Sequence, residues 1–262
     1  MSIEQSAMRQ LPLEKQLRKL RLWNIVVGLV LAVEAALVGV LTNSFSLPVT
    51  GGFINGPPGT IPGSYRLFNI ATGWGIFAFL VISAVALLLI ASPFVFPWYK
   101  QNLIQSRNYG RWIEYFFSSS IMIVLIAQIT GISDIAALIA IFAINASMIL
   151  FGALQEKYEK PGKQPNLLPF WFGCFAGIIP WIAIVIYVIA PGVAASPPGF
   201  VYGIIVSLFV FFNCFAVNMI LQYRQIGPWR DYLFGEKVYI ILSLTAKSLL
   251  AWLVFANVLV LK

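Results

Sequence analysis

Long apolar stretches separated by short polar connections dominate the chain. A helix needs about 20 apolar residues to cross the roughly 30 Å hydrocarbon core of a bilayer. Seven stretches reach that length, and none shows the alternation typical of a membrane β-barrel. We therefore expect an all-α membrane protein, a seven-transmembrane-helix bundle that forms a single domain over residues 1–262. The predicted spans are residues 22–42, 69–92, 109–131, 133–154, 168–190, 200–223 and 236–260.

The two longest polar segments lie before the first span and after it. Residues 1–21 contain acidic side chains and lack the apolar core of a signal peptide, so they are expected to remain as a cytoplasmic tail. Residues 43–68 are rich in Gly and Pro and also contain β-forming residues. This composition predicts a small β-hairpin or ordered cap in the first outer loop.

Lysine and arginine lie on alternate connections. Because such residues concentrate on the cytoplasmic side of a membrane, we predict a multi-pass protein of the cell membrane with a cytoplasmic N-terminus and an extracellular C-terminus. The opposite side carries only Arg66 and Lys262. The orienting residues are Arg9, Lys15, Arg18, Lys19, Arg21, Lys100, Arg107, Arg111, Lys157, Lys160, Lys163, Arg224, Arg230 and Lys237.

Composition supports the membrane assignment and narrows the chemistry. The chain is 60% hydrophobic and 10% charged, with a mean hydropathy of +0.88. Its net charge of +8 follows from the orienting residues, so we do not expect nucleic-acid binding. Histidine is absent, which removes most imidazole catalysis and most transition-metal sites. Cys174 and Cys214 lie in apolar runs and are expected to be buried thiols. We predict no metal site, no catalytic residue and no enzyme activity.

Three ionisable side chains remain within the predicted spans: Glu34, Glu114 and Lys247. Such residues cost about 2.5–3.5 kcal/mol each on insertion scales and often mark function. Glu114 lies about 7 Å into its helix and Lys247 about 15 Å, at 1.5 Å per residue. Helical side chains lean toward the N-terminus. The amine of Lys247 can therefore reach Glu114 if the third and seventh helices are neighbours.

Three interpretations of this pair remain open. It is a buried ion pair that fixes helix packing, or a relay for protons or substrate in a transporter, or the site of a Schiff base between Lys247 and a carbonyl ligand. Ser118 shares a helix face with Glu114, and Ser243 shares one with Lys247. Two hydroxyls beside the two charged groups favour the Schiff base. Further candidates for an apolar ligand pocket are Met122, Asn145, Trp181, Phe209 and Phe212.

Two segments resemble the heliorhodopsins, a family of microbial retinal proteins. RWIEYFFSSSIM, residues 111–122, is similar to the third-helix motif of that family, and GEKVYIILSLTAKSLLAW, residues 235–252, is similar to its retinal-lysine helix. The inside N-terminus and the long first outer loop also fit, and the resemblance covers essentially the whole chain.

The resemblance implies a light-sensing protein with all-trans retinal bound covalently to Lys247 as a protonated Schiff base. Glu114 would be its counter-ion, with Ser118 and Ser243 as polar neighbours. Family members are generally non-pumping and dimeric, with a slow photocycle and proposed signalling or enzyme-regulating roles. We therefore expect a homodimer with a cytoplasmic signalling or enzyme partner. A light-gated channel or pump is the main alternative, followed by a retinal-free transporter that uses the Lys247 and Glu114 pair.

One departure from the family concerns the group that accepts the proton released by the Schiff base during the photocycle. Members often have histidines in the polar cavity near the Schiff base, whereas Leu31 stands where a first-helix histidine is common and Glu34 where a neutral amide is usual. A histidine acceptor is excluded. The proton must go to Glu114, to water or to another group.

Overall fold

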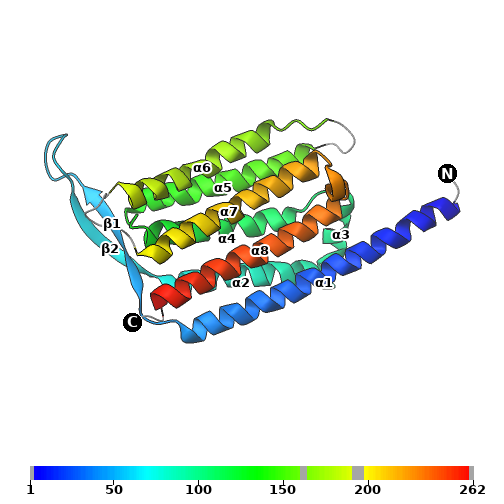
Figure 1. Cartoon of the computed structure of the whole chain (residues 1–262), viewed down its shortest axis with the longest axis horizontal. Helices are drawn as coiled ribbons and strands as arrows, with labels where there is room; N and C mark the ends of the chain where they lie inside the picture. The colour runs from blue at the N-terminus through cyan, green and yellow to red at the C-terminus, as the bar shows by residue number, and fades with distance from the viewer. Residues whose placement is uncertain (1–2, 160–163, 191–197, 260–262) are drawn as a thin grey trace.

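Seven helices long and apolar enough to cross a membrane form one bundle in the computed structural model, among the residues that it describes, 3–159, 164–190 and 198–259 (Figure 1). This confirms the predicted fold class. The helices are α1 (Ile3–Leu41), α2 (Thr72–Ala91), α4 (Tyr109–Ile129), α5 (Ile135–Tyr158), α6 (Leu168–Ile189), α7 (Gly199–Tyr223) and α8 (Tyr232–Val254).

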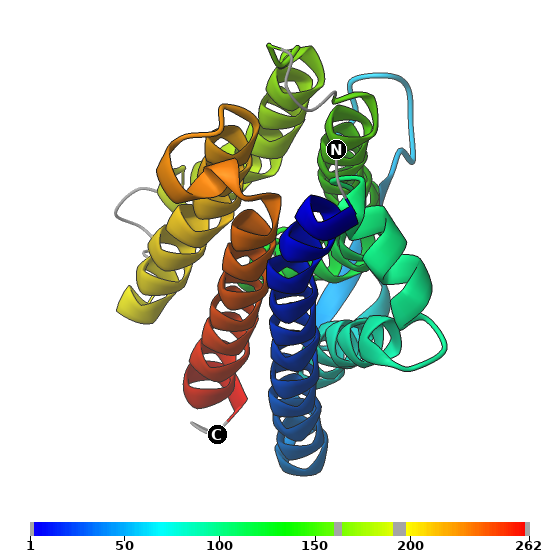
Figure 2. The ribbon, with the colours of Figure 1, turned by 90° about the vertical axis from the view of Figure 1, so that its right-hand side faces the viewer.

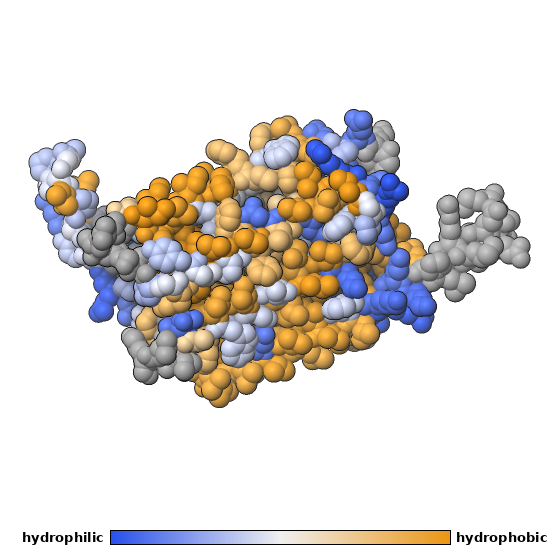
Figure 3. Space-filling view, viewed as in Figure 1, coloured by the Kyte–Doolittle hydropathy of each residue, from blue (hydrophilic) through white to orange (hydrophobic). Residues whose placement is uncertain are grey.

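The helices pack side by side, and the two motif-bearing helices, α4 and α8, have a large buried share. α1 packs on α2, α2 on α4, α4 on α5 and α5 on α6. α8 packs on both α7 and α1, and Figure 2 shows it between them. Apolar residues predominate over the middle of the molecule, whereas hydrophilic residues gather toward its two ends (Figure 3). This banding suits a helix bundle surrounded by lipid, in which backbone polar groups are satisfied within each helix.

One end of the bundle is formed by β1 (Ser46–Phe53) and β2 (Gly63–Ala71), which pair in antiparallel register. The expected hairpin is therefore present, and we call this the hairpin end. Thr50 connects it to the turn between α4 and α5, since its backbone N–H donates to Ser133 O over 2.8 Å. The two hydroxyls of these residues also lie 2.9 Å apart.

The opposite end, which we call the basic end, carries the N-terminal part of α1 and the α2–α4, α5–α6 and α7–α8 connections (Figure 1). Most of the predicted orienting residues lie here, and Arg66 lies on the hairpin. Lys160, Lys163 and Lys262 fall outside the described residues.

Two features of the basic end differ from the predictions. The tail is not separate from the first span, because α1 runs without a break from Ile3 to Leu41. Leu17 and Leu20 are buried, so packing as well as the helix-forming Leu, Lys and Arg residues extends the helix in this direction. A short helix, α3 (Phe96–Ile104), was also not expected; it lies within the α2–α4 connection and buries Tyr99 and Leu103.

Candidate functional site

Lys247 on α8 and Glu114 on α4 meet in the interior of the bundle. Lys247 Nζ lies 2.8 Å from Glu114 Oε1, and the two residues are 3% and 5% exposed. The lean of helical side chains toward the N-terminus brings the lysine to the depth of the carboxylate. Desolvation offsets much of the attraction in such a pair, so stability alone is a weak reason for its presence.

Hydroxyl groups from two helices complete the polar centre. Lys247 Nζ donates to Ser243 Oγ over 2.6 Å, one turn earlier on α8. Ser83 Oγ on α2 donates to Glu114 Oε1 over 2.6 Å and is buried. Sequence reasoning missed Ser83, because one serine in an apolar helix gives no sign of the face on which it lies. The ring of Tyr115 adds a cation–π contact, with its centroid 5.1 Å from Lys247 Nζ.

A cavity of about 180 Å³ opens beside the amine of Lys247. Ser118, Met122, Trp181, Phe209, Phe212 and Ser243, all candidates from the sequence, lie on its wall. The indole of Trp181 packs edge-on against both phenyl rings, with centroid distances of 5.3 Å to Phe209 and 5.5 Å to Phe212. Aromatic and apolar walls with a few polar groups are typical of a site for an elongated apolar ligand.

Glycine residues give this cavity its width. A Cβ on Gly152 would lie 2.5 Å from the ring of Trp112, and one on Gly177 would lie 2.4 Å from the sulfur of Met148. The hydroxyl of Ser118 is buried on the cavity wall without a hydrogen-bond partner in the described part of the chain. An orphaned hydroxyl and a lysine on the wall of one mostly apolar cavity fit an apolar ligand that carries a polar group.

Among the candidates for the apolar ligand pocket, Asn145 is the one that does not line the cavity. Its Nδ2 donates to Ser119 Oγ over 2.9 Å and to Ser120 Oγ over 3.1 Å, so it connects α5 to α4. The expectation that it faces the bundle interior holds, but its amide nitrogen donates to α4 instead of facing the cavity. We therefore remove it from the residues that contact a ligand.

The variant Asn145→Ala is expected to lower stability without changing the ligand site. Interhelical hydrogen bonds in membranes contribute about 0.6 kcal/mol on average and about 1.7 kcal/mol at most, so we expect a loss of about 1 kcal/mol. Thermal unfolding in detergent measures that loss. The absorption maximum of any bound chromophore should be unchanged, and a clear spectral shift would return Asn145 to the site.

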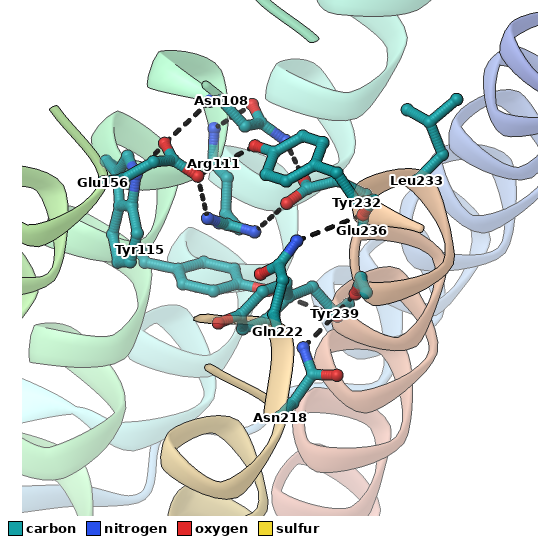
Figure 4. Close-up of polar contacts among 12 residues, drawn as sticks. Asn108, Arg111, Tyr115, Glu156, Asn218, Gln222, Tyr232, Leu233, Glu236 and Tyr239 are labelled. Atoms are coloured by element: carbon teal, nitrogen blue, oxygen red, sulfur yellow. Dashed lines mark hydrogen bonds and ion pairs between the residues drawn. The ribbon is translucent and has the colours of Figure 1, made fainter. Parts of the chain in front are cut away.

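A second buried polar cluster lies toward the basic end, and Figure 4 shows Arg111 between Glu156 and Glu236. Arg111 forms ion pairs with both carboxylates, and the Arg111–Glu156 pair measures 2.7 Å. Arg111 was predicted only as an orienting residue, and neither glutamate was counted among the membrane charges. That count was wrong, because all three are at least 94% buried. Their positions near helix ends resembled those of interfacial residues.

Asn108, the residue that caps α4, joins this cluster to its surroundings. Its Oδ1 accepts from Arg111 N–H over 3.0 Å, which satisfies a free donor at the helix start. Its Nδ2 lies within 2.6 Å of Glu236 Oε2 and 3.3 Å of the Tyr99 hydroxyl. Burial raises the pKa of Tyr99 on α3 well above its ordinary value. Tyr99 is thus a neutral hydroxyl at physiological pH.

Glu34 on α1 is separate from both polar centres. It is half-buried, and it accepts from Ser248 Oγ over 2.9 Å and from Trp252 Nε1 over 3.2 Å. Both partners lie on α8, so Glu34 fixes the packing of α1 against that helix. It does not line the cavity beside Lys247.

Comparisons with known proteins find one family match and similar folds among solved structures. A family model described as Heliorhodopsin matches residues 20–259. No curated protein matches the chain in sequence. The crystal structure of the light-driven proton pump Coccomyxa subellipsoidea rhodopsin is similar, with a TM-score of 0.63 and 16% identity over 91% of this chain and 96% of that one. Thermophilic rhodopsin from Rubrobacter xylanophilus gives a TM-score of 0.62 and 14% identity over 90% and 95%. At these identities, the two structures are similar to this chain in fold alone.

Proposed function

Because this chain belongs to the heliorhodopsin family, which implies a retinal-binding, light-sensing rhodopsin, we propose that Lys247 carries all-trans retinal as a protonated Schiff base with Glu114 as counter-ion. The observation that carries the proposal is the amine of Lys247 beside an apolar cavity of about 180 Å³, with Glu114 Oε1 2.8 Å away. Covalent attachment needs a free amine, and a cationic product needs a nearby anion.

The residues of the site have separate roles in this proposal. Lys247 would hold the ligand, because its amine can form a C=N bond with an aldehyde and release water. Glu114 stabilises the cationic nitrogen, while Ser83 and Ser243 orient the two groups through their hydroxyls. Met122, Trp181, Phe209 and Phe212 enclose the apolar part of the ligand and exclude water. When bound, retinal supplies light absorption and isomerisation.

We propose a slow signalling photocycle without net ion transport. An outward pump needs proton carriers staged on both sides of the Schiff base. Toward the hairpin end, the described acidic residues that could serve are Glu34 and Asp134. Glu34 is engaged with α8, and Asp134 caps α5 by accepting from the N–H groups of Ala136 and Ala137. Neither forms a path from Lys247, which favours a sensor over a pump or channel.

Orientation and partners belong to the same proposal. The basic end faces the cytoplasm, because lysine and arginine concentrate there. The protein acts as a homodimer in the cell membrane, and light changes how its cytoplasmic end engages a signalling or enzyme partner. The heliorhodopsin family supports the dimer and the partner, and the charge distribution supports the orientation.

Illuminated vesicles that contain the retinal-loaded protein are expected to show no sustained change in external pH and no light-driven current. A pH electrode and a planar bilayer measure the two quantities. Vesicles with a light-driven proton pump serve as the positive control. A sustained pH change that a protonophore abolishes would support a pump, and a current that follows the applied voltage would support a channel.

A further inference from the structure

The buried cluster at the basic end has an excess of negative charge. Among the described residues, Arg111 is the one cation in direct contact with Glu156 and Glu236, and the three residues are 6%, 2% and 1% exposed. One guanidinium balances one carboxylate, so the second carboxylate is uncompensated. Two carboxylates that share a buried site resist simultaneous ionisation, and one of them readily accepts a proton. This cluster can therefore store a proton.

Hydrogen bonds distinguish the two carboxylates. Glu156 accepts four donors: Asn108 N–H at 2.7 Å, Arg111 at 2.7 Å, Trp112 Nε1 at 2.6 Å and the Tyr232 hydroxyl at 2.8 Å. Glu236 accepts from the side chains of Asn108 and Arg111, and the Tyr232 hydroxyl, which donates to Glu156, also interacts with it. Donors stabilise the ionised form of a carboxylate. Glu156 is thus held as the anion, and Glu236 is the member of the cluster that can take a proton.

The contacts of Glu236 fit the ionised form of its carboxylate. Oε2 accepts from Asn108 and Oε1 from Arg111, so both oxygens act as acceptors. A protonated carboxyl would need an acceptor for its own O–H, whereas Asn108 Nδ2 and the arginine can only donate. The resting cluster therefore has room for a proton at Glu236.

A small cavity of about 30 Å³ is lined by residues of both this cluster and the Lys247 centre. Glu114 and Ser243 from the Lys247 centre and Arg111 and Glu236 from the cluster all line it. Two buried polar atoms on its wall, Asn24 Oδ1 and Arg111 Nε, have no hydrogen-bond partner in the described part of the chain. A cavity of this size holds water, and polar walls with unsatisfied atoms favour it. Water in this cavity would relay a proton from one centre to the other.

From these contacts we infer that Glu236 is the terminal acceptor of the proton that leaves the Lys247 nitrogen after illumination. This inference rests on the proposed function. The N–H bond at Lys247 breaks, an O–H bond forms at Glu236, and the water relay ends unchanged. The positive charge at Lys247 and the negative charge at Glu236 both disappear, and Glu114 remains ionised. The same path returns the proton, so no net transport results.

Other ionisable groups surround Glu236, and none replaces it in this role. Arg111 forms an ion pair with Glu236, and Glu156 shares Arg111 as its partner. Phenol groups also face it from three helices, and each is a neutral donor rather than an acceptor at physiological pH. These residues are Tyr99 on α3, Tyr223 on α7, and Tyr232 and Tyr239 on α8.

Light-minus-dark infrared spectroscopy of the retinal-loaded protein tests the assignment. In the wild type, loss of the visible band should coincide with gain of a protonated carboxyl C=O band. Glu236→Gln should remove this band and slow deprotonation of the Lys247 nitrogen by about 100-fold, within the range that a positioned proton-transfer group contributes. Glu236→Asp should shift the frequency of the band. Glu34→Gln, which changes a membrane carboxyl outside the path, should leave both the band and the rate unchanged.

A second readout uses the retinal-free protein. An infrared pH titration should show Glu236 changing from carboxylate to carboxylic acid as the pH falls, and Glu236→Gln should lack that change. If no visible band forms with retinal, the proposed function fails. If the band forms but the wild type gains no protonated carboxyl, or gains one that persists unshifted in Glu236→Gln and Glu236→Asp, only the role of Glu236 is overturned. A protonated carboxyl band that shifts in Glu114→Asp, but in neither Glu236 variant, would assign the proton to Glu114.

Discussion

The variant Lys247→Arg is expected to show no visible absorption band with all-trans retinal, whereas the wild type acquires one. Arginine keeps the positive charge beside Glu114, but its guanidinium remains protonated and cannot form an imine at neutral pH. The ion pair therefore survives while the covalent site is lost. Absorption spectra after addition of retinal to the purified protein measure the difference.

Two further variants separate chemistry from folding. Lys247→Ala should also lose the band, and propylamine added with retinal should restore part of it, because it supplies the three carbons and the nitrogen that alanine lacks. Lys237→Ala removes another lysine from the same helix, near Trp23 at the basic end, and should keep the band. A band that persists in both Lys247 variants without added amine would rule out Lys247 as the attachment site.

The variant Glu114→Gln is expected to replace the visible band with a near-ultraviolet band at neutral pH. A carboxylate about 4 Å from the cation contributes about 4 kcal/mol at an effective dielectric constant of 20. Loss of that stabilisation disfavours the protonated form, so its titration midpoint should fall by about three pH units, at about 1.4 kcal/mol per unit. A spectroscopic pH titration measures the midpoint.

Comparison with Glu114→Asp gives the control for this prediction. Aspartate keeps the charge at a slightly greater distance, so its midpoint should lie between those of the wild type and Glu114→Gln. Addition of a permeant anion such as chloride should partly restore the visible band of Glu114→Gln, because the anion can substitute for the missing charge. An unchanged titration in Glu114→Gln would mean that another group is the counter-ion.

Periodicity and charge predicted the fold well because a bilayer imposes strong rules on sequence. The length of the apolar stretches located the seven helices, and Gly and Pro in residues 43–68 located the hairpin. The family match over residues 20–259 confirms the resemblance derived from the two helix motifs. Depth along each helix was enough to anticipate that Lys247 and Glu114 could meet.

Features that depend on side-chain contacts between distant segments could not be derived in the same way. Ser83 contacts Glu114 only because α2 packs on α4. A single serine in an apolar helix does not reveal which neighbouring helix it faces. Glu156 and Glu236 lie 45 and 125 residues from Arg111, and near helix ends all three resembled interfacial charges. Asn145 failed as a ligand residue for the converse reason. A polar group in a membrane must face inward, but that rule does not say whether it meets a ligand or another helix.

The most direct test of the central claim is to locate the chromophore chemically. Borohydride reduction of the illuminated or dark pigment converts an imine to a stable secondary amine, and mass spectrometry of the digested protein then identifies the modified lysine. We expect one retinyl group, on the peptide that contains Lys247, and none in Lys247→Arg. A retinyl group on a different lysine, or a visible band with no modified peptide, would contradict a retinal Schiff base at Lys247.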